Sequence, residues 1–305
     1  MRSLRFAGLV AMQLSILALA GIAGAPAAAK LSVVCTTTDL ADFAQQVGGD
    51  KVSVHCILKG GQDPHFTRPT PGVERIVHDA DVFIQTGLDL ETWAPKVLEG
   101  ARNPRLFIVT ATKGMNTLEK YPQGVTPAKG DVHPAGNPHV FHDPTNAKLA
   151  VSNILAAFMA VDRANADYYR ERARAYLTKL SEKAEEWDKL MAPCRGREVV
   201  AYHNTWVYLS HRYGIRIPIY LEPLPGIAPS AKHLARVIET MKQRNINVIV
   251  VQTYYPRKIA ESVARQTGAE VITLAGYPRE LPGTDSYIEM MEYNLRALRK
   301  ALLGK

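Results

Sequence analysis

The stretch Val199-Val200-Ala201-Tyr202-His203-Asn204-Thr205-Trp206 is an apolar run that ends in a histidine and then passes into a helical pattern. It predicts a buried strand, a turn and a helix, with His203 at the carboxyl end of the strand. Open α/β sheets bind their ligands at that edge, just outside the carboxyl ends of the strands. The stretch therefore predicts the fold class and, at the same time, one candidate functional residue.

The same succession of apolar run and helical pattern occurs on both sides of this stretch. Further strands are predicted at residues 31–35, 52–58, 82–85, 106–109, 217–220, 247–251 and 271–274. Strands that alternate with helices form mostly parallel sheets that are covered on both faces. We therefore expect an α/β protein with two similar parallel-sheet βα lobes, an N-terminal lobe at residues 30–143 and a C-terminal lobe at residues 193–305.

Between the two lobes lies the longest helical pattern of the chain. It begins at Asp143-Pro144-Thr145-Asn146, where Asp143 is a suitable helix cap, and continues to about Met191 without an internal proline or glycine. A helix of this length would extend over roughly 65 Å, because each residue adds about 1.5 Å. We predict one long rigid helix at residues 144–192 that links the lobes.

The first 29 residues differ from the rest of the chain. Arg2 and Arg5 precede an almost uninterrupted apolar run over residues 6–25, and three alanines at 27–29 supply the small residues of a cleavage site. This pattern is typical of a cleaved signal peptide. An uncleaved membrane anchor is the alternative, although the apolar core is short for a membrane span. We predict that residues 1–29 are a signal peptide and that the mature protein is periplasmic.

The charge distribution gives no support for a nucleic-acid partner. The formal net charge of +8 falls to +6 without the leader, which holds two arginines and no acid. The remaining lysines and arginines are scattered among acidic residues instead of forming a stripe.

The cysteine pattern is equally uninformative about a metal site. The three cysteines, Cys35, Cys56 and Cys194, contain no C-x-x-C pair, so a thiolate zinc site is not predicted. A disulfide between Cys35 and Cys56 and three buried thiols both remain open.

Four potential metal ligands follow predicted strands. His65 comes after the strand at 52–58, His139 comes after the strand at 106–109 and a long loop, His203 ends its strand, and Asp285 follows the strand at 271–274. Three imidazoles and one carboxylate are a ligand set typical of zinc.

The loop at 115–137 is long enough to have a function of its own. It contains His133, Asp131 and Glu119, which could capture a metal transiently, but the segment also fits a plain surface loop.

These residues lie in motifs that resemble those of a known family. The motifs are Asp63-Pro64-His65, Asn137-Pro138-His139-Val140, Tyr202-His203 with Tyr208, and Asp285-Ser286-Tyr287 with Met290-Met291. In this order and spacing they are similar to the cluster A-I metal-binding solute-binding proteins of ABC importers, a group that includes the zinc binders of the Znu and Azt systems. The similarity covers nearly the whole mature chain.

The resemblance implies a metal ion held between the lobes by His65, His139, His203 and Asp285. It implies high-affinity capture of Zn²⁺ as the transported ligand, delivery to the ABC permease of a zinc importer, and a monomeric protein. A periplasmic zinc metallochaperone is a further partner that the family leaves open.

The chain also departs from the family pattern. His142 stands where the family usually has an apolar residue, Gln252 replaces a glutamate that many relatives carry, and the loop before His139 contains only His133 instead of many histidines. We therefore expect His142 to lie outside the ligand set.

Three other functions stay open at this point. A manganese-binding homologue is one, although manganese prefers more oxygen ligands and the family's manganese members have a carboxylate in place of His203. A metal-dependent adhesin would differ only in its partners. A zinc hydrolase is less expected, because the chain lacks H-E-x-x-H and offers only Glu222 as a candidate base.

Overall fold

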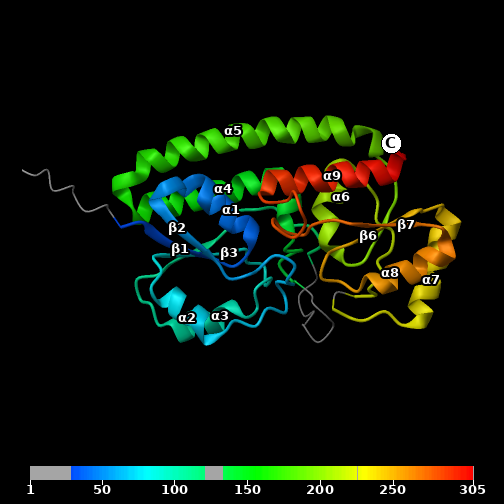
Figure 1. The fold of residues 1–305 in the computed structure, drawn as a ribbon, viewed down its shortest axis with the longest axis horizontal. Helices are drawn as coiled ribbons and strands as arrows, with labels where there is room; N and C mark the ends of the chain where they lie inside the picture. The colour runs from blue at the N-terminus through cyan, green and yellow to red at the C-terminus, as the bar shows by residue number, and fades with distance from the viewer. Residues whose placement is uncertain (1–28, 121–132, 225, 305) are drawn as a thin grey trace, which may run out of the picture.

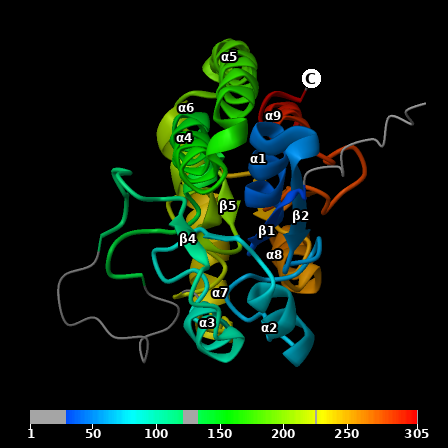
Figure 2. The same cartoon turned by 90° about the vertical axis from the view of Figure 1, so that its left-hand side faces the viewer.

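The computed structural model describes residues 29–120, 133–224 and 226–304. Two α/β lobes lie side by side along the long axis of the molecule, and a layer of helices covers one side of both (Figure 1). Viewed along that axis, the strands lie in a middle layer with helices above and below them (Figure 2). The predicted α/β class and the two-lobe arrangement are confirmed. The predicted signal peptide falls almost entirely outside the described residues.

The N-terminal lobe contains a parallel four-stranded sheet in the order β2-β1-β3-β4. Its strands are β1 (Leu31–Cys35), β2 (Val52–Cys56), β3 (Val82–Gln85) and β4 (Phe107–Thr110). Alternate residues point to opposite faces, so Val33 contacts the core beneath α1 (Thr38–Gly48), whereas Val34 contacts the core beside α2 (Pro71–His78) and α3 (Ala94–Ala101). This alternation buries both faces of the sheet at its central strands, β1 and β3, whereas residues of the edge strands β2 and β4 are partly exposed.

The C-terminal lobe has a smaller parallel sheet in the order β5-β6-β7. The strands are β5 (Val200–Ala201), β6 (Val248–Val251) and β7 (Glu270–Thr273), and the helices are α6 (Val207–Tyr213), α7 (Ala231–Arg244), α8 (Arg257–Thr267) and α9 (Tyr287–Leu303). The segment predicted as a strand at 217–220 forms a single isolated bridge, between Ala201 and Tyr220. Pro218 lies within that segment and has no N–H to offer to a strand ladder, which accounts for the difference.

The predicted single linking helix is wrong in its extent, because the segment forms two helices. These are α4 (Pro144–Val161) and α5 (Ala166–Met191), separated by Asp162 and a short 3-10 turn, Arg163–Asn165. The side chain of Asp162 accepts hydrogen bonds from Asn165 and from the hydroxyl of Tyr169, and these bonds stabilise the turn. The chain therefore reverses, α5 packs on α4, and α5 alone extends across both lobes (Figure 1).

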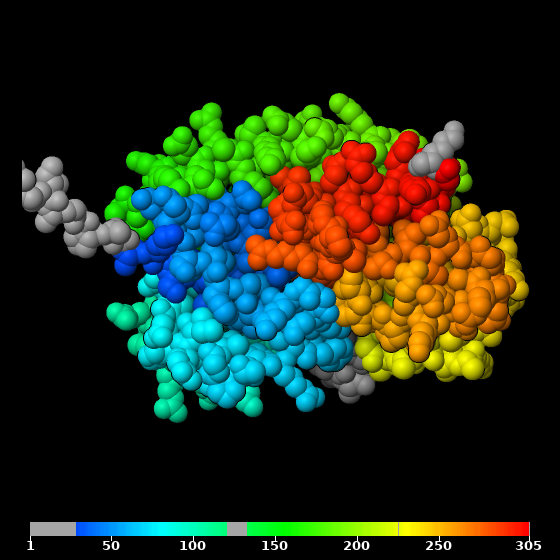
Figure 3. All heavy atoms as spheres, viewed as in Figure 1, coloured from blue at the N-terminus to red at the C-terminus, as the bar shows by residue number. Residues whose placement is uncertain are grey.

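A continuous core beneath α4, α5 and α9 joins the lobes. It contains Val33 and Phe43 from the N-terminal lobe together with Val250 and Leu295 from the C-terminal lobe. Hydrogen bonds cross the same boundary, since the Tyr287 amide donates to Asp42 and the Tyr287 hydroxyl donates to the carbonyl of Phe141. In the space-filling view the orange and red C-terminal segment lies directly against the blue N-terminal lobe (Figure 3). The lobes are thus fastened together along this side.

The structure answers the question of the cysteines. Cys35 and Cys56 are paired in register on neighbouring strands, but all three cysteines are free thiols. Within the described ranges, the structure contains no helix that combines the length and the apolar character needed to cross a membrane.

Candidate metal centre

His65 lies in the loop that follows β2. Its backbone amide donates to the Asp63 carboxylate at 3.0 Å, which makes a local turn, and the indole of Trp93 donates to the carbonyl of Pro64 at 2.9 Å. The proline and these two hydrogen bonds fix the backbone on either side of the histidine. The side chain of His65 is buried, although the Asp-Pro-His motif alone does not predict burial.

His139 is held in the same way by the residue two positions before it. The Asn137 side chain accepts from the His139 amide at 2.9 Å, and its NH₂ group donates to the carbonyl of Asn204 and to the carboxylate of Glu119. Asn204 follows His203, so Asn137 connects the backbone beside one histidine to the backbone beside the other. The two imidazoles are therefore positioned relative to each other by a shared hydrogen-bond network.

His203 lies two residues after the end of β5 and brings a side chain from the C-terminal lobe. Its Nδ1 lies 2.9 Å from the carboxylate of Glu222, and its ring stacks on Tyr255 with the centroids 5.5 Å apart. Only 2% of the residue is exposed, so the ring is enclosed on all sides except the one that faces the other histidines.

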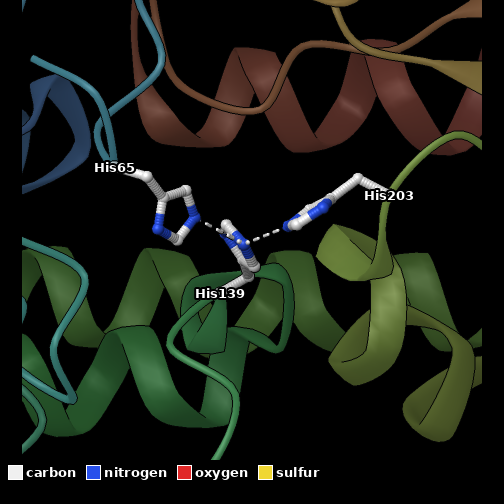
Figure 4. A group of neighbouring side chains, drawn as sticks. All are labelled: His65, His139 and His203. Atoms are coloured by element: carbon white, nitrogen blue, oxygen red, sulfur yellow. Dashed lines mark hydrogen bonds between the residues drawn. The ribbon is translucent and has the colours of Figure 1, made fainter. Parts of the chain in front are cut away.

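The three imidazoles converge on one point between the lobes (Figure 4). The Nε2 of His139 lies 3.3 Å from the Nε2 of His65 and 3.3 Å from the Nε2 of His203. Two nitrogens bound to a tetrahedral zinc ion at about 2.0–2.1 Å would lie roughly 3.3–3.4 Å apart. The two distances from the Nε2 of His139 thus match the edge of a zinc coordination tetrahedron, and potential ligand atoms of all three residues lie within 4.8 Å of one another.

The protonation state of the central imidazole favours metal binding. Burial lowers the pKa of His139 well below its ordinary value, and the neighbouring imidazoles of His65 and His203 lower it further. A neutral imidazole has a lone pair to offer to a metal ion, whereas a protonated one has none. The centre is consequently prepared for a divalent cation at neutral pH.

The structure does not bring Asp285 to the three histidines. Asp285 is exposed and lies one residue before Ser286, whose side chain caps α9 in a reciprocal pair with Glu289. The cap of this helix is therefore Ser286 and not Asp285. The carboxylate of Asp285 is not among the ligand atoms that lie within 4.8 Å of one another. Sequence order alone could not separate these positions, because both residues follow the same strand.

Two further histidines lie near the centre without joining that group. His142 is buried against Trp206, with ring centroids 4.6 Å apart, and its burial lowers its pKa to about 3. His133 is also buried, and its ring centroid lies 5.2 Å from that of His65. Its position brings the end of the 115–137 loop close to the centre. Asp131 lies outside the described residues.

The sequence pointed to two contributors without assigning their roles. Glu222 was considered only as a base for hydrolysis, yet it contacts His203 directly. Asn137 was part of a motif, but nothing in its pattern indicated the link to Glu119 and Asn204. Such links depend on how loops from separate lobes meet, which spacing along the chain does not encode.

The fold and the three histidines define a two-lobed metal-binding protein, and comparison with known proteins identifies its family. The chain belongs to the family described as zinc-uptake complex component A, periplasmic, whose model matches residues 33–301.

Individual relatives and solved structures agree with this assignment. The high-affinity zinc uptake system protein ZnuA of Bacillus subtilis is 29% identical over 284 residues, which cover 90% of this chain and 89% of that protein. The manganese ABC transporter substrate-binding lipoprotein PsaA of Streptococcus pneumoniae is 26% identical and covers 90% of this chain and 89% of its own. A crystal structure of ZnuA superposes with a TM-score of 0.78 over 89% of this chain and 99% of that chain, at 23% identity. The laminin-binding adhesin of Streptococcus agalactiae, at 26% identity, has a TM-score of 0.77 over 89% of this chain and 99% of that chain.

Proposed function

We propose that this protein captures a zinc ion between its lobes and delivers it to the permease of an ABC importer. The observation that carries the proposal is the convergence of three imidazoles, with the Nε2 of His139 lying 3.3 Å from the Nε2 of His65 and 3.3 Å from the Nε2 of His203. Three imidazole nitrogens suit zinc, which has no ligand-field preference of its own. Membership of a zinc-uptake family supports the same cargo.

We propose Asp285 as the fourth zinc ligand only in a rearranged state of the protein, whereas the sequence predicted it as a ligand without this condition. The carboxylate is exposed in this structure, so it becomes a ligand only after the segment at 276–286 moves toward the imidazoles. An oxygen donor would complete the set of three nitrogens that zinc accepts readily. A mobile fourth ligand would also provide a route for release of the ion.

Manganese is the second candidate cargo, because PsaA is a relative of this chain and carries manganese in its name. The three-nitrogen donor set argues against it, since manganese favours oxygen donors and higher coordination numbers. The adhesin relative differs in the partner it is named for, and a binding assay with laminin would test that role.

The protein is proposed to act outside the cytoplasm as a monomer, with the segment at 1–29 removed on export. The apolar leader and the lipoproteins among the relatives support the extracytoplasmic location. A periplasmic metallochaperone would be an optional source of the ion. We propose no enzymatic activity, because Glu222, the candidate base for hydrolysis, is hydrogen-bonded to His203, where it supports metal binding instead.

Elemental analysis of the purified mature chain, combined with assays of ester and amide hydrolysis, tests this function. We expect one zinc per chain, displacement of manganese by zinc in competition, and no turnover. A preparation that retains manganese against equimolar zinc, or that hydrolyses the test substrates, would contradict the proposal.

A further inference from the structure

Glu222 is a buried carboxylate that faces the metal centre through one imidazole. Only 9% of the residue is exposed, and its Oε2 lies 2.9 Å from the Nδ1 of His203. On the opposite side of the same ring, the Nε2 of His203 lies 3.3 Å from the Nε2 of His139. The carboxylate and the centre thus contact the two different nitrogens of a single side chain.

This contact determines which nitrogen of His203 carries the proton. An ionised carboxylate only accepts hydrogen bonds, so it selects the tautomer with a hydrogen on Nδ1. That tautomer leaves the lone pair on Nε2, the nitrogen that faces His139 and His65. With the other tautomer, a proton would occupy the position from which the metal is bound.

Backbone contacts hold the carboxylate in register with the histidine. The amide of Leu221 donates to the carbonyl of Ala201 at 2.9 Å, and the amide of Glu222 donates to the carbonyl of Tyr202 at 3.0 Å. Residues 221 and 222 therefore run alongside the end of β5, next to His203. The amide of Gly226 also donates to Oε2 of Glu222, at 3.4 Å. The position of Glu222 is consequently set by the same strand end that presents the imidazole.

The charge of Glu222 has a second effect on the centre. Three neutral imidazoles bring no negative charge to a divalent cation, and Asp285 is exposed to solvent in this structure. A carboxylate that is hydrogen-bonded to a ligating histidine makes that histidine a stronger donor and offsets part of the cation's charge.

We infer that Glu222 is a positioning residue for zinc capture: it fixes the tautomer and orientation of His203 and supplies a buried negative charge one imidazole away from the ion. The inference rests on the proposed function, because it assigns to Glu222 the strength of zinc binding at the same three histidines. It gives a use to a side chain whose alternative role was that of a hydrolytic base.

Three variants separate this role from a purely structural one. Glu222→Ala removes both the acceptor and the charge, whereas Glu222→Gln retains an oxygen acceptor of the same size and removes only the charge. Glu198→Gln is the matched control, because Glu198 is a largely buried carboxylate of the same lobe that pairs with Arg244 instead of an imidazole.

Two measurements are made on each full-length mature variant. Zinc affinity is measured by competition with a chelator, and the tautomer of His203 in the metal-free protein is read from ¹⁵N chemical shifts, assigned with a His203→Gln variant. We expect Glu222→Ala to weaken zinc binding by about 10- to 100-fold and to shift His203 away from the Nδ1–H tautomer. Glu222→Gln should fall between Glu222→Ala and the wild type, and Glu198→Gln should match the wild type.

The results distinguish failure of this inference from failure of the proposed function. A wild-type protein that does not bind zinc would refute the function, while the tautomer measurement would still test the effect of Glu222 on His203. Wild-type zinc affinity in Glu222→Ala would overturn the inference. So would an equal loss in Glu222→Ala and Glu222→Gln with the His203 tautomer unchanged, since this is the pattern of general structural damage.

Discussion

Replacement of His142 by phenylalanine tests how far burial of a neutral imidazole controls acid stability. His142 is 4% exposed, packs against Trp206, and has a pKa lowered to about 3 by burial. The unfolded chain has an ordinary histidine pKa of about 6.5. The unfolded state therefore binds a proton that the folded state excludes, and stability is lost as the pH falls from 6.5 toward 3.

The size of the effect follows from the two pKa values. A pH of 5 lies about 1.5 units below the unfolded-state pKa of His142. Protonation then stabilises the unfolded state relative to the folded state by roughly 2 kcal/mol. At pH 7.5 this stabilisation is close to zero. Phenylalanine does not titrate and can pack on the indole, so the His142→Phe variant should lose about 2 kcal/mol less than the wild type between these pH values.

Urea unfolding of the zinc-free protein at pH 7.5 and pH 5.0 measures this difference. Other titrating groups contribute equally to both proteins and cancel in the comparison. His211→Gln is the control, because His211 is exposed and its replacement should leave the pH dependence unchanged. A wild type and a His142→Phe variant with parallel pH profiles would refute the reasoning. Zinc affinity of the variant should also stay within about tenfold of the wild type, as for a residue outside the ligand set.

Three further predictions concern the metal centre. His139→Ala should weaken zinc binding by about two orders of magnitude or more in chelator competition. Zinc-binding free energies of about 10–16 kcal/mol, divided among four ligands, give roughly 3 kcal/mol for each ligand. A change below threefold would exclude His139 as a ligand. Asp285→Asn should weaken binding by about tenfold or more if the carboxylate moves into the shell, and wild-type affinity would leave the shell with three protein ligands. Calorimetry at pH 6 in two buffers should show a smaller proton release on zinc binding than the roughly 2.3 protons that three imidazoles of ordinary pKa, about 6.5, would give, because the lowered pKa of His139 leaves it already neutral. A release of that size or larger would contradict this.

The class of fold could be predicted from the sequence because buried parallel strands leave a clear apolar signal. β6, with the sequence Val248-Ile249-Val250-Val251, is buried at every position and was predicted within one residue of its bounds. The cap of α4 was equally readable, since Asp143 accepts from the amide of Thr145 as its position before Pro144 predicts. Such features depend on a few neighbouring residues, so local reasoning reaches them.

The turn between α4 and α5 lies beyond that reach. No proline or glycine interrupts the helical pattern there, and the helix ends because Asp162 bonds to Asn165 and Tyr169. Asparagine and aspartate compete with helix through such side-chain bonds, but they do so at a minority of the places where they occur. The predicted length of about 65 Å was the only sign that the segment had to break.

The candidate site likewise contains predicted residues that the structure brings together and one whose position depends on tertiary contacts. Three of the four predicted ligands, His65, His139 and His203, converge in the structure. His65 and His139 belong to the N-terminal lobe and His203 to the separate sheet of the C-terminal lobe, so strand-end positions predicted the candidates but not how the two lobes bring them together. Asp285 follows β7 by a segment whose direction depends on tertiary contacts such as the bond from Thr38 to the carbonyl of Pro278.

The core shared by α4, α5 and α9 has a consequence for how the protein melts and evolves. Because Phe43 and Leu295 belong to one apolar cluster, neither lobe retains a complete interior when the other unfolds. Heating should therefore produce a single calorimetric transition instead of two. A gene fragment encoding either half would expose the apolar side of that cluster to water, so the halves are inherited as a pair and cannot be exchanged as independent modules.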